Sequence, residues 1–164
     1  MSKVSEILDK IVVKQGHAIS WLMVLLVILT GFEVFRRYAL SSPTVWGLEF
    51  TTFLFGIHFI MGFSYTEQFE GHVNVDILAS RLSKKTQIIL WLTATVLFTL
   101  PVISLLLYGA ILYAYESVII FEKNSTAWSP PIWPVKLFIP AGFALLFMQV
   151  ISNCIKKFNS LKTL

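Results

Sequence analysis

Residues 88–113 read IILWLTATVLFTLPVISLLLYGAILY, 26 residues in a row without one charged side chain. A helix needs roughly 20 mostly apolar residues to cross the hydrocarbon core of a bilayer, because no backbone polar group can stay unpaired in lipid. This run therefore predicts a membrane-spanning helix. The chain as a whole is 56% hydrophobic and only 13% charged, with a mean hydropathy of +0.76. That composition excludes a soluble domain of this size.

Three further apolar runs lie along the chain, from about Ile19 to Phe35, Phe50 to Tyr65 and Leu137 to Ile155. With their flanks, the four predicted spans cover approximately residues 18–38, 47–68, 87–114 and 135–156. The predicted fold class is an all-α integral membrane protein, with four transmembrane helices in a single membrane domain over residues 1–164. Pro101 and Pro140 each remove a backbone donor inside a span, and we expect both helices to bend there.

The basic residues are distributed unequally between the two sides of such a four-span protein. Nine lysines and arginines fall on the side of the termini and four on the other side. Since basic residues near span ends are retained in the cytoplasm, both termini are predicted to be cytoplasmic, an N-in/C-in topology. The loops over 37–46 and 116–136 are then outside. The net charge of +4 follows from this topology and gives no sign of nucleic-acid binding.

Two amphipathic segments are predicted to lie on the cytoplasmic membrane surface. Val4, Ile7 and Ile11 recur at helical spacing among charged residues, which indicates an interfacial helix over residues 2–14. The alternative is that this segment runs straight into the first span. Residues 74–84 mix apolar and charged side chains in a similar way and predict a second interfacial helix before the third span.

Four ionisable residues lie near the outer ends of the first two spans, namely Glu33, Arg36, Arg37 and Glu49. A charge inside a span costs at least ~2.5 kcal/mol at the bilayer centre, so Glu33 and Glu49 need partners or a function. Arg37 follows Glu33 by four residues, the spacing at which the two side chains meet on a helix. We favour a buried network of Glu33, Arg37 and Glu49 that fixes the hairpin. The functional alternative is that a glutamate binds a proton or sodium ion during transport.

The histidines and the single cysteine do not favour a metal or haem site. His17 and His58 differ in depth by roughly 12 Å at 1.5 Å per residue, so they do not form a bis-histidine haem site of the kind found in respiratory membrane anchors. Cys154 alone cannot form a disulfide or a thiolate metal site within the chain. No nucleophile and base pair, phosphate loop or pair of catalytic carboxylates stands out, so we expect no enzymatic activity.

One short segment between the second and third spans combines Gly71, His72 and Asp76. On a helix, the imidazole and the carboxylate four residues later would share a face, and with Glu70 they could hold a metal. No further nitrogen or sulfur ligand is evident nearby. An interfacial cap fits better, in which Gly71 ends the span and the two side chains bond to backbone groups at the turn.

The two outer loops carry the remaining candidate binding residues. Pro43 follows two serines in a tight hairpin between the first two spans. The loop over 116–136 contains three prolines and the tryptophans Trp128 and Trp133. Tryptophan at a span end normally anchors in the headgroup layer, which is the reading we favour, and a surface for docking a partner is the alternative.

In combination these residues resemble the small membrane subunit of tripartite ATP-independent periplasmic (TRAP) transporters, the DctQ-like family. The resemblance rests on Arg37-Tyr38, Pro43, Trp46, Glu49, Gly62, Gly71-His72-Val73, Val75-Asp76, Pro131, Trp133, Lys136, the run from Ile139 to Phe143, and Gln149. It covers nearly the whole chain.

The resemblance implies an accessory role in a bacterial inner membrane. In that family the small subunit is a static scaffold that forms a heterodimer with a large elevator-type subunit, and a periplasmic binding protein delivers the substrate. The sodium used for uptake would bind at the large subunit, with no cofactor on this chain. The substrate would be an organic acid, such as a C4-dicarboxylate or a sialic acid. Candidate contacts with the binding protein are Tyr38, Pro43, Trp46, Trp128 and Trp133.

Two alternatives from other classes remain. One is a self-sufficient small four-helix exporter, coupled to protons through Glu33. The other is a membrane anchor of a respiratory complex. An exporter would lose its transport in Glu33→Gln, and an anchor would show a haem absorbance band or quinone-dependent activity on purification.

Overall fold

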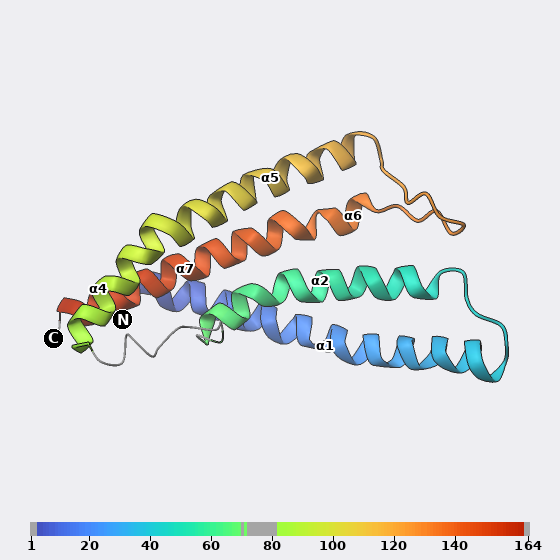
Figure 1. Ribbon diagram of the computed structural model, residues 1–164, viewed down its shortest axis with the longest axis horizontal. Helices are drawn as coiled ribbons and strands as arrows, with labels where there is room; N and C mark the ends of the chain where they lie inside the picture. The colour runs from blue at the N-terminus through green and yellow to red at the C-terminus, as the bar shows by residue number, and fades with distance from the viewer. Residues whose placement is uncertain (1–2, 70, 72–81, 163–164) are drawn as a thin grey trace.

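Four long helical rods run side by side in the computed structural model, which describes residues 3–69, 71 and 82–162 (Figure 1). The rods long and apolar enough to cross a membrane are Lys3–Ala39, Gly47–Gln68, Lys84–Ile119 and Trp133–Lys162. Over the described residues there is no β-strand, and the only extended pairing is an isolated bridge between Lys123 and Pro131. The predicted all-α fold with four candidate spans is therefore confirmed.

The first rod is the single helix α1 (Lys3–Ala39), and the second is α2 (Gly47–Gln68). The third rod consists of α4 (Lys84–Ala94), the π-helical turn η1 (Thr95–Thr99) and α5 (Leu100–Ile119). The fourth consists of the short α6 (Trp133–Lys136) and α7 (Phe138–Lys162). α1 begins, α2 ends, α4 begins and α7 ends at one end of the molecule, here named the termini end (Figure 1).

The opposite end, here named the loop end, carries two connections. The hairpin loop covers residues 40–46 between α1 and α2, and the long loop covers residues 120–132 between α5 and α6. Both lie on the right in Figure 1. Since all helices run between the two ends, any partner that approaches along the helix axes at the loop end meets these two loops first.

The structure does not separate the expected interfacial helix over 2–14 from the first span. From Lys3 onward these residues are the first part of α1, which was the alternative reading. At 1.5 Å per residue, the 37 residues of α1 are about 55 Å long, well beyond a hydrocarbon core of about 30 Å. The second expected interfacial helix, over 74–84, lies outside the described residues except for its last three positions, of which Ser83 caps α4 through a bond from the Thr86 amide.

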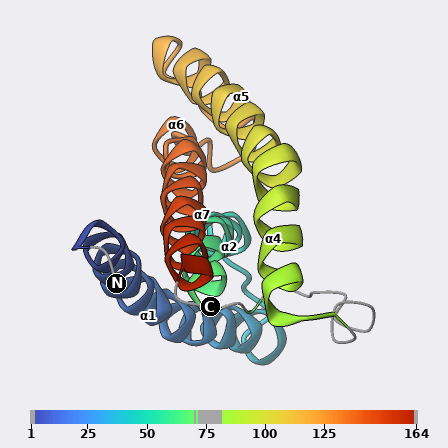
Figure 2. The same cartoon turned by 90° about the vertical axis from the view of Figure 1, so that its left-hand side faces the viewer.

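Helix α7 lies at the centre of the packing. It contacts α1, α2, α4 and α5, and α1 also packs along α2, whereas α5 has no comparable contact with α1 or α2 among the described residues. The view along the bundle shows α2 and α7 between α1 and the curved rod of α4 and α5 (Figure 2). At Gly142 a Cβ atom would stand 2.7 Å from the Ile60 carbonyl oxygen, so only glycine permits this approach of α7 to α2.

Both intramembrane prolines mark an irregularity in their helix. Pro101 has no N–H for the carbonyl four residues earlier, and the π-helical turn Thr95–Thr99 immediately precedes the first turn of α5. Pro140 likewise leaves the Lys136 carbonyl without its helical donor, and the helix is interrupted at Leu137 between α6 and α7. An irregularity thus lies shortly before each proline, and the expected bends at Pro101 and Pro140 stay a prediction.

Candidate functional site

The hairpin loop at the loop end is held by side chains of the last two turns of α1. Glu33 is only 8% exposed, and its carboxylate accepts hydrogen bonds from the hydroxyl and the amide of Thr44. Its other oxygen lies 3.2 Å from Nη2 of Arg37, in the ion pair expected from their spacing. Arg36 points elsewhere and donates to the carbonyl and hydroxyl oxygens of Ser42, at 3.0 and 2.9 Å. The cluster therefore ties the end of α1 to the start of α2.

Glu49 does not join this cluster, although the sequence suggested one network with Glu33 and Arg37. Its Oε2 atom accepts bonds from Asn124 Nδ2 at 3.0 Å and from Thr126 Oγ1 at 2.9 Å. The reason is geometric, because the long loop passes over the first turn of α2 and brings its own donors to the Glu49 carboxylate. The two glutamates thus serve different loops: Glu33 fixes the hairpin loop, and Glu49 fixes the long loop.

Aromatic side chains reinforce the contact between the two loops. Phe50 packs edge-on against Trp46 of the hairpin loop and against Trp128 of the long loop, with ring centroids 6.2 and 6.4 Å apart. Trp46 and Trp128 remain 36% and 38% exposed. We name the surface formed by the hairpin loop and the long loop, joined through Phe50 and Glu49, the loop-end platform.

The other candidate contact residues lie around this platform in different ways. Tyr38 is 79% exposed at the end of α1, and Pro43 is exposed in the hairpin loop. Trp133 is half-buried at the start of α6, where its ring packs edge-on against Phe121 at 6.2 Å. Only Trp46 and Trp128 are thus brought together, through Phe50, and the five residues do not form one continuous patch of contacting rings.

The long loop has a defined internal structure. Within it, the Asn124 amide bonds to the Pro130 carbonyl at 2.9 Å, and the Ile132 amide bonds to the Glu122 carbonyl at 3.0 Å. Phe121 has a positive φ of 47°, a conformation that is unfavourable for a bulky side chain. Such strain persists only where the surroundings hold it in place. With the bridge between Lys123 and Pro131, these bonds give the loop the form of a small hairpin.

An ion pair closes the base of the long loop. Lys136 Nζ donates to Glu122 Oε2 and also lies 4.0 Å from the centre of the Tyr113 ring. This hydrogen bond from the ammonium group holds the pKa of the Glu122 carboxyl below its usual value. The carboxylate is therefore ionised, and the ion pair intact, at neutral pH.

A second polar cluster, at the termini end, was not expected from the sequence. Asp9 of α1 accepts bonds from Ser152 at 2.7 Å and Gln149 at 3.1 Å, and pairs with Lys156 at 3.0 Å, all three on α7. Asn153 donates to the side chain and the carbonyl of Glu67 at 3.0 and 3.1 Å, which adds α2. We name these residues the polar lock, because they join α1, α2 and α7.

The signals for these missed residues are present in the sequence but are ambiguous without the fold. Gln149, Ser152 and Lys156 recur at helical spacing in the last span, which marks a polar stripe but no partner. Asp9 is one of the charged residues in the segment 2–14 for which an interfacial helix was predicted. Asn124 and Thr126 stand in a loop where polar residues are ordinary, and only the path of that loop over α2 gives them a role.

The remaining motifs have no ligand-binding geometry in the described residues. Gly71 closes the end of α2, with its amide bonded to the Thr66 carbonyl at 2.9 Å, whereas His72 and Asp76 lie outside the described residues, so their interfacial cap stays a prediction. A ring nitrogen of His58 lies 3.2 Å from the Ile19 carbonyl oxygen. Within the described ranges no three His, Cys, Asp or Glu side chains converge as a metal site would require.

Comparison with known families identifies the chain. Residues 26–160 match the family described as "Tripartite ATP-independent periplasmic transporters, DctQ component". No curated protein matches the sequence. The match runs from the middle of α1 to the last turns of α7 and includes both loops of the platform, so the resemblance seen in the sequence is confirmed. The chain belongs to the DctQ family, the small membrane component of TRAP transporters.

Proposed function

We propose that this protein is a static scaffold for the large, elevator-type subunit of a TRAP transporter, which takes up an organic acid together with sodium. The proposal rests on the observation that charged residues of the bundle form fixed contacts between helices and loops. Glu33, Arg37, Glu49 and Asp9 are each committed to hydrogen bonds or ion pairs that join helices or loops. A scaffold needs such fixed joints, whereas a carrier needs a polar site that opens to each side in turn.

The same observation speaks against a small exporter coupled through Glu33. A coupling carboxylate must gain and lose a proton or an ion during the cycle. Glu33 accepts two bonds from Thr44 at one oxygen and one from Arg37 at the other, so its protonation would remove the ion pair and weaken the bonds that fix the hairpin loop. The respiratory anchor is not favoured either, because the family assignment points to transport.

We further propose that the loop-end platform faces the periplasm and receives the substrate-binding protein, in a bacterial inner membrane with both termini in the cytoplasm. The excess of basic residues near the termini supports this orientation. The platform suits a docking role because its two loops are already joined through Glu49 and Phe50, and preorganised loops lose less conformational entropy on binding.

Co-purification tests the scaffold role. A tagged chain co-expressed with its neighbouring genes and extracted in mild detergent should carry a much larger multi-spanning protein at equal stoichiometry. Uptake into vesicles should require both proteins, a sodium gradient and the binding protein. A chain that remains a lone monomer or homodimer under these conditions, or that transports by itself, would contradict the proposal.

The substrate class needs a separate experiment, because we expect that no residue of this chain determines which substrate is taken up. Uptake of a C4-dicarboxylate and of a sialic acid is compared for the complete transporter, as competition against a labelled substrate. Substitutions at Trp46 and Trp128 should weaken docking of the binding protein and lower uptake of every accepted substrate by the same factor. A changed ratio between substrates in these variants would show that this chain takes part in selection.

A further inference from the structure

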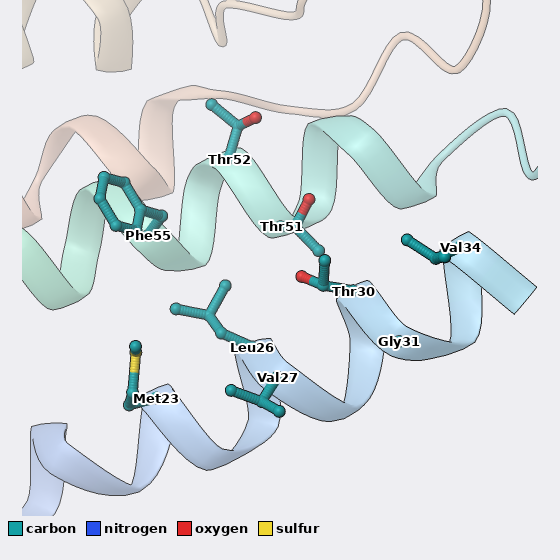
Figure 3. Close-up of a pocket in the computed structure, with 9 residues that line it drawn as sticks. All are labelled: Met23, Leu26, Val27, Thr30, Gly31, Val34, Thr51, Thr52 and Phe55. Carbon is teal, nitrogen blue, oxygen red and sulfur yellow. The ribbon is translucent and has the colours of Figure 1, made fainter.

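An open groove runs along the outer surface of the bundle between α1 and α2. It has a volume of about 550 Å³ and is lined by six residues of α1 between Met23 and Val34, and by Thr51, Thr52 and Phe55 of α2 (Figure 3). Its flanks are exposed, since Val27 and Phe55 are 62% and 55% accessible. The groove is therefore open to whatever surrounds the helices in the bilayer.

The surface of the groove is apolar although it contains threonines. The Thr51 hydroxyl bonds to the carbonyls of Gly47 and Leu48, each at 2.9 Å, and the Thr52 hydroxyl bonds to the Leu48 carbonyl at 2.8 Å. These hydroxyls need no further partner. Figure 3 shows Thr30 and Thr51 facing each other from the two helices, and nothing lies within 4 Å of a Cβ atom placed on Gly31. An apolar occupant fits this surface.

The length of the groove corresponds to one leaflet of a bilayer. From Met23 to Val34 the α1 helix rises by about 16 Å at 1.5 Å per residue, and half of the hydrocarbon core is about 15 Å. Arg37 and Tyr38 follow Val34 by three and four residues, so they continue the same helix face one turn beyond the groove. The Arg37 side chain is 46% exposed although it pairs with Glu33, and Tyr38 is 79% exposed. Within the described residues Arg36 bonds only to neutral oxygens of Ser42, so Glu33, Arg36 and Arg37 together leave one net positive charge at this end of α1.

We propose that this groove binds a phospholipid, with one acyl chain between α1 and α2 and the phosphate group at Arg37. The charge at the end of the groove favours this occupant over a helix of a partner protein. A partner's spanning helix would bring more hydrocarbon to the level of the guanidinium, whereas a phospholipid brings an anion there and hydrocarbon below it. Tyr38, the next residue along α1, is exposed and could contact the headgroup as well. This inference is independent of the proposed function, because it concerns a site within this chain.

Photocrosslinking in vesicles tests the site. The co-purified complex is reconstituted in phosphatidylethanolamine and phosphatidylglycerol that contains a trace of either lipid with a diazirine at the middle of one acyl chain. Adducts are then mapped by peptide mass spectrometry. We expect them to concentrate on Val27 and Phe55 at the groove. Equal labelling of the opposite face of α1, at Ile28 and Phe35, would overturn the proposal.

Two pairs of variants separate the groove from the headgroup contact. Gly31→Leu fills the groove and should remove most of the adduct. Gly109→Leu, on α5 and equally free of neighbours within 4 Å, should leave it unchanged. Arg37→Gln should lower the adduct yield about fivefold, the contribution of one basic residue near an anionic surface, whereas Arg37→Lys should largely retain it. Unchanged labelling in Gly31→Leu would refute the acyl-chain site.

A further measurement distinguishes the alternative occupant. A benzophenone amino acid at position 27 should react with lipid. If it reacts instead with the large subunit, the groove is a protein interface and the lipid proposal is wrong, while the scaffold role stands. If no large subunit co-purifies, the proposed scaffold role is wrong. The lipid crosslinking can then be carried out on this chain by itself and still tests the groove.

Discussion

Glu49 is the residue at which the loop-end platform can be tested most directly. Its Oε2 atom alone receives both side-chain bonds that join α2 to the long loop, from Asn124 at 3.0 Å and Thr126 at 2.9 Å. A bond to a charged group contributes about 1.5–3 kcal/mol when it is shielded from water. Both bonds here are partly open to solvent, so we take roughly 1 kcal/mol for each, the net value of an ordinary hydrogen bond.

Glu49→Ala should therefore destabilise the closed position of the long loop by about 2 kcal/mol, which is roughly 30-fold in its opening equilibrium. Amide hydrogen exchange of the reconstituted complex measures this opening. The Asn124 and Ile132 amides, which are bonded within the loop, should exchange about 30-fold faster. Glu49→Gln should have a smaller effect, because its amide oxygen still accepts bonds. If the variant acts only by opening the long loop, the affinity of the binding protein for the transporter should fall by no more than about this 30-fold.

Glu116→Ala is the matched control. Glu116 is an exposed glutamate in the last turn of α5, at the loop end of the molecule. Among the described residues, no hydrogen bond or ion pair of its carboxylate is found, and only its backbone carbonyl accepts a bond. Exchange in the long loop should be the same as in the unmodified protein. The reasoning is refuted if the long loop exchanges equally fast in Glu49→Ala and in the unmodified protein, or if Glu116→Ala has as large an effect as Glu49→Ala.

Three further predictions concern packing, the polar lock and pH. Gly142→Leu should destabilise the protein by about 1–3 kcal/mol or more through overpacking against α2. Gly62→Leu should leave the stability unchanged, because a Cβ atom at Gly62 meets nothing within 4 Å. Thermal unfolding in detergent compares the two variants. Asp9→Ala should cost about 3 kcal/mol, because it removes the carboxylate from a partly buried ammonium group and the acceptor from one N–H of the buried Gln149 amide, whose nitrogen keeps its bond to Asn153. An unchanged midpoint in the same melting assay would contradict this. The Glu122 ion pair should contribute stability that is fully present above the usual pKa of a glutamate and is lost as the pH falls through the lowered pKa. Hydrogen exchange of the long loop, measured against pH, should show this loss. In Glu122→Gln this pH dependence should be absent.

The sequence was sufficient for the fold because the fold depends on composition and periodicity. Four apolar runs of the right length predict four spanning helices, because every backbone N–H and C=O group in lipid must find its hydrogen-bond partner within the protein. Pro101 and Pro140 each follow an irregularity in their helix, and the reason, the missing N–H, is equally local. The Glu33 and Arg37 pair was also accessible, since four residues along a helix bring two side chains together whatever surrounds them.

The contacts between distant segments could not be obtained in the same way. Glu49 was assigned to Glu33 because the two lie at similar depth in a folded hairpin, and depth does not reveal that the long loop crosses to α2. Asp9 and Lys156 are almost the whole chain apart, and their pairing depends on α7 packing beside the first turns of α1. Such contacts follow from the relative position of helices, which one sequence alone does not specify.

The central position of α7 has a consequence for how the protein is made. The ribosome synthesises α1, α2 and the rod of α4 and α5 before α7, yet α7 supplies the partners of Asp9 and of Glu67, and is the helix on which α5 packs. The first three spans must therefore wait in the membrane as an α1–α2 hairpin and a separate rod. Asp9 acquires its partners Gln149, Ser152 and Lys156 only when the last span has been inserted. A chain that lacks α7 therefore lacks the contacts that join its two halves, and the four-helix bundle can form only after the last span has been inserted.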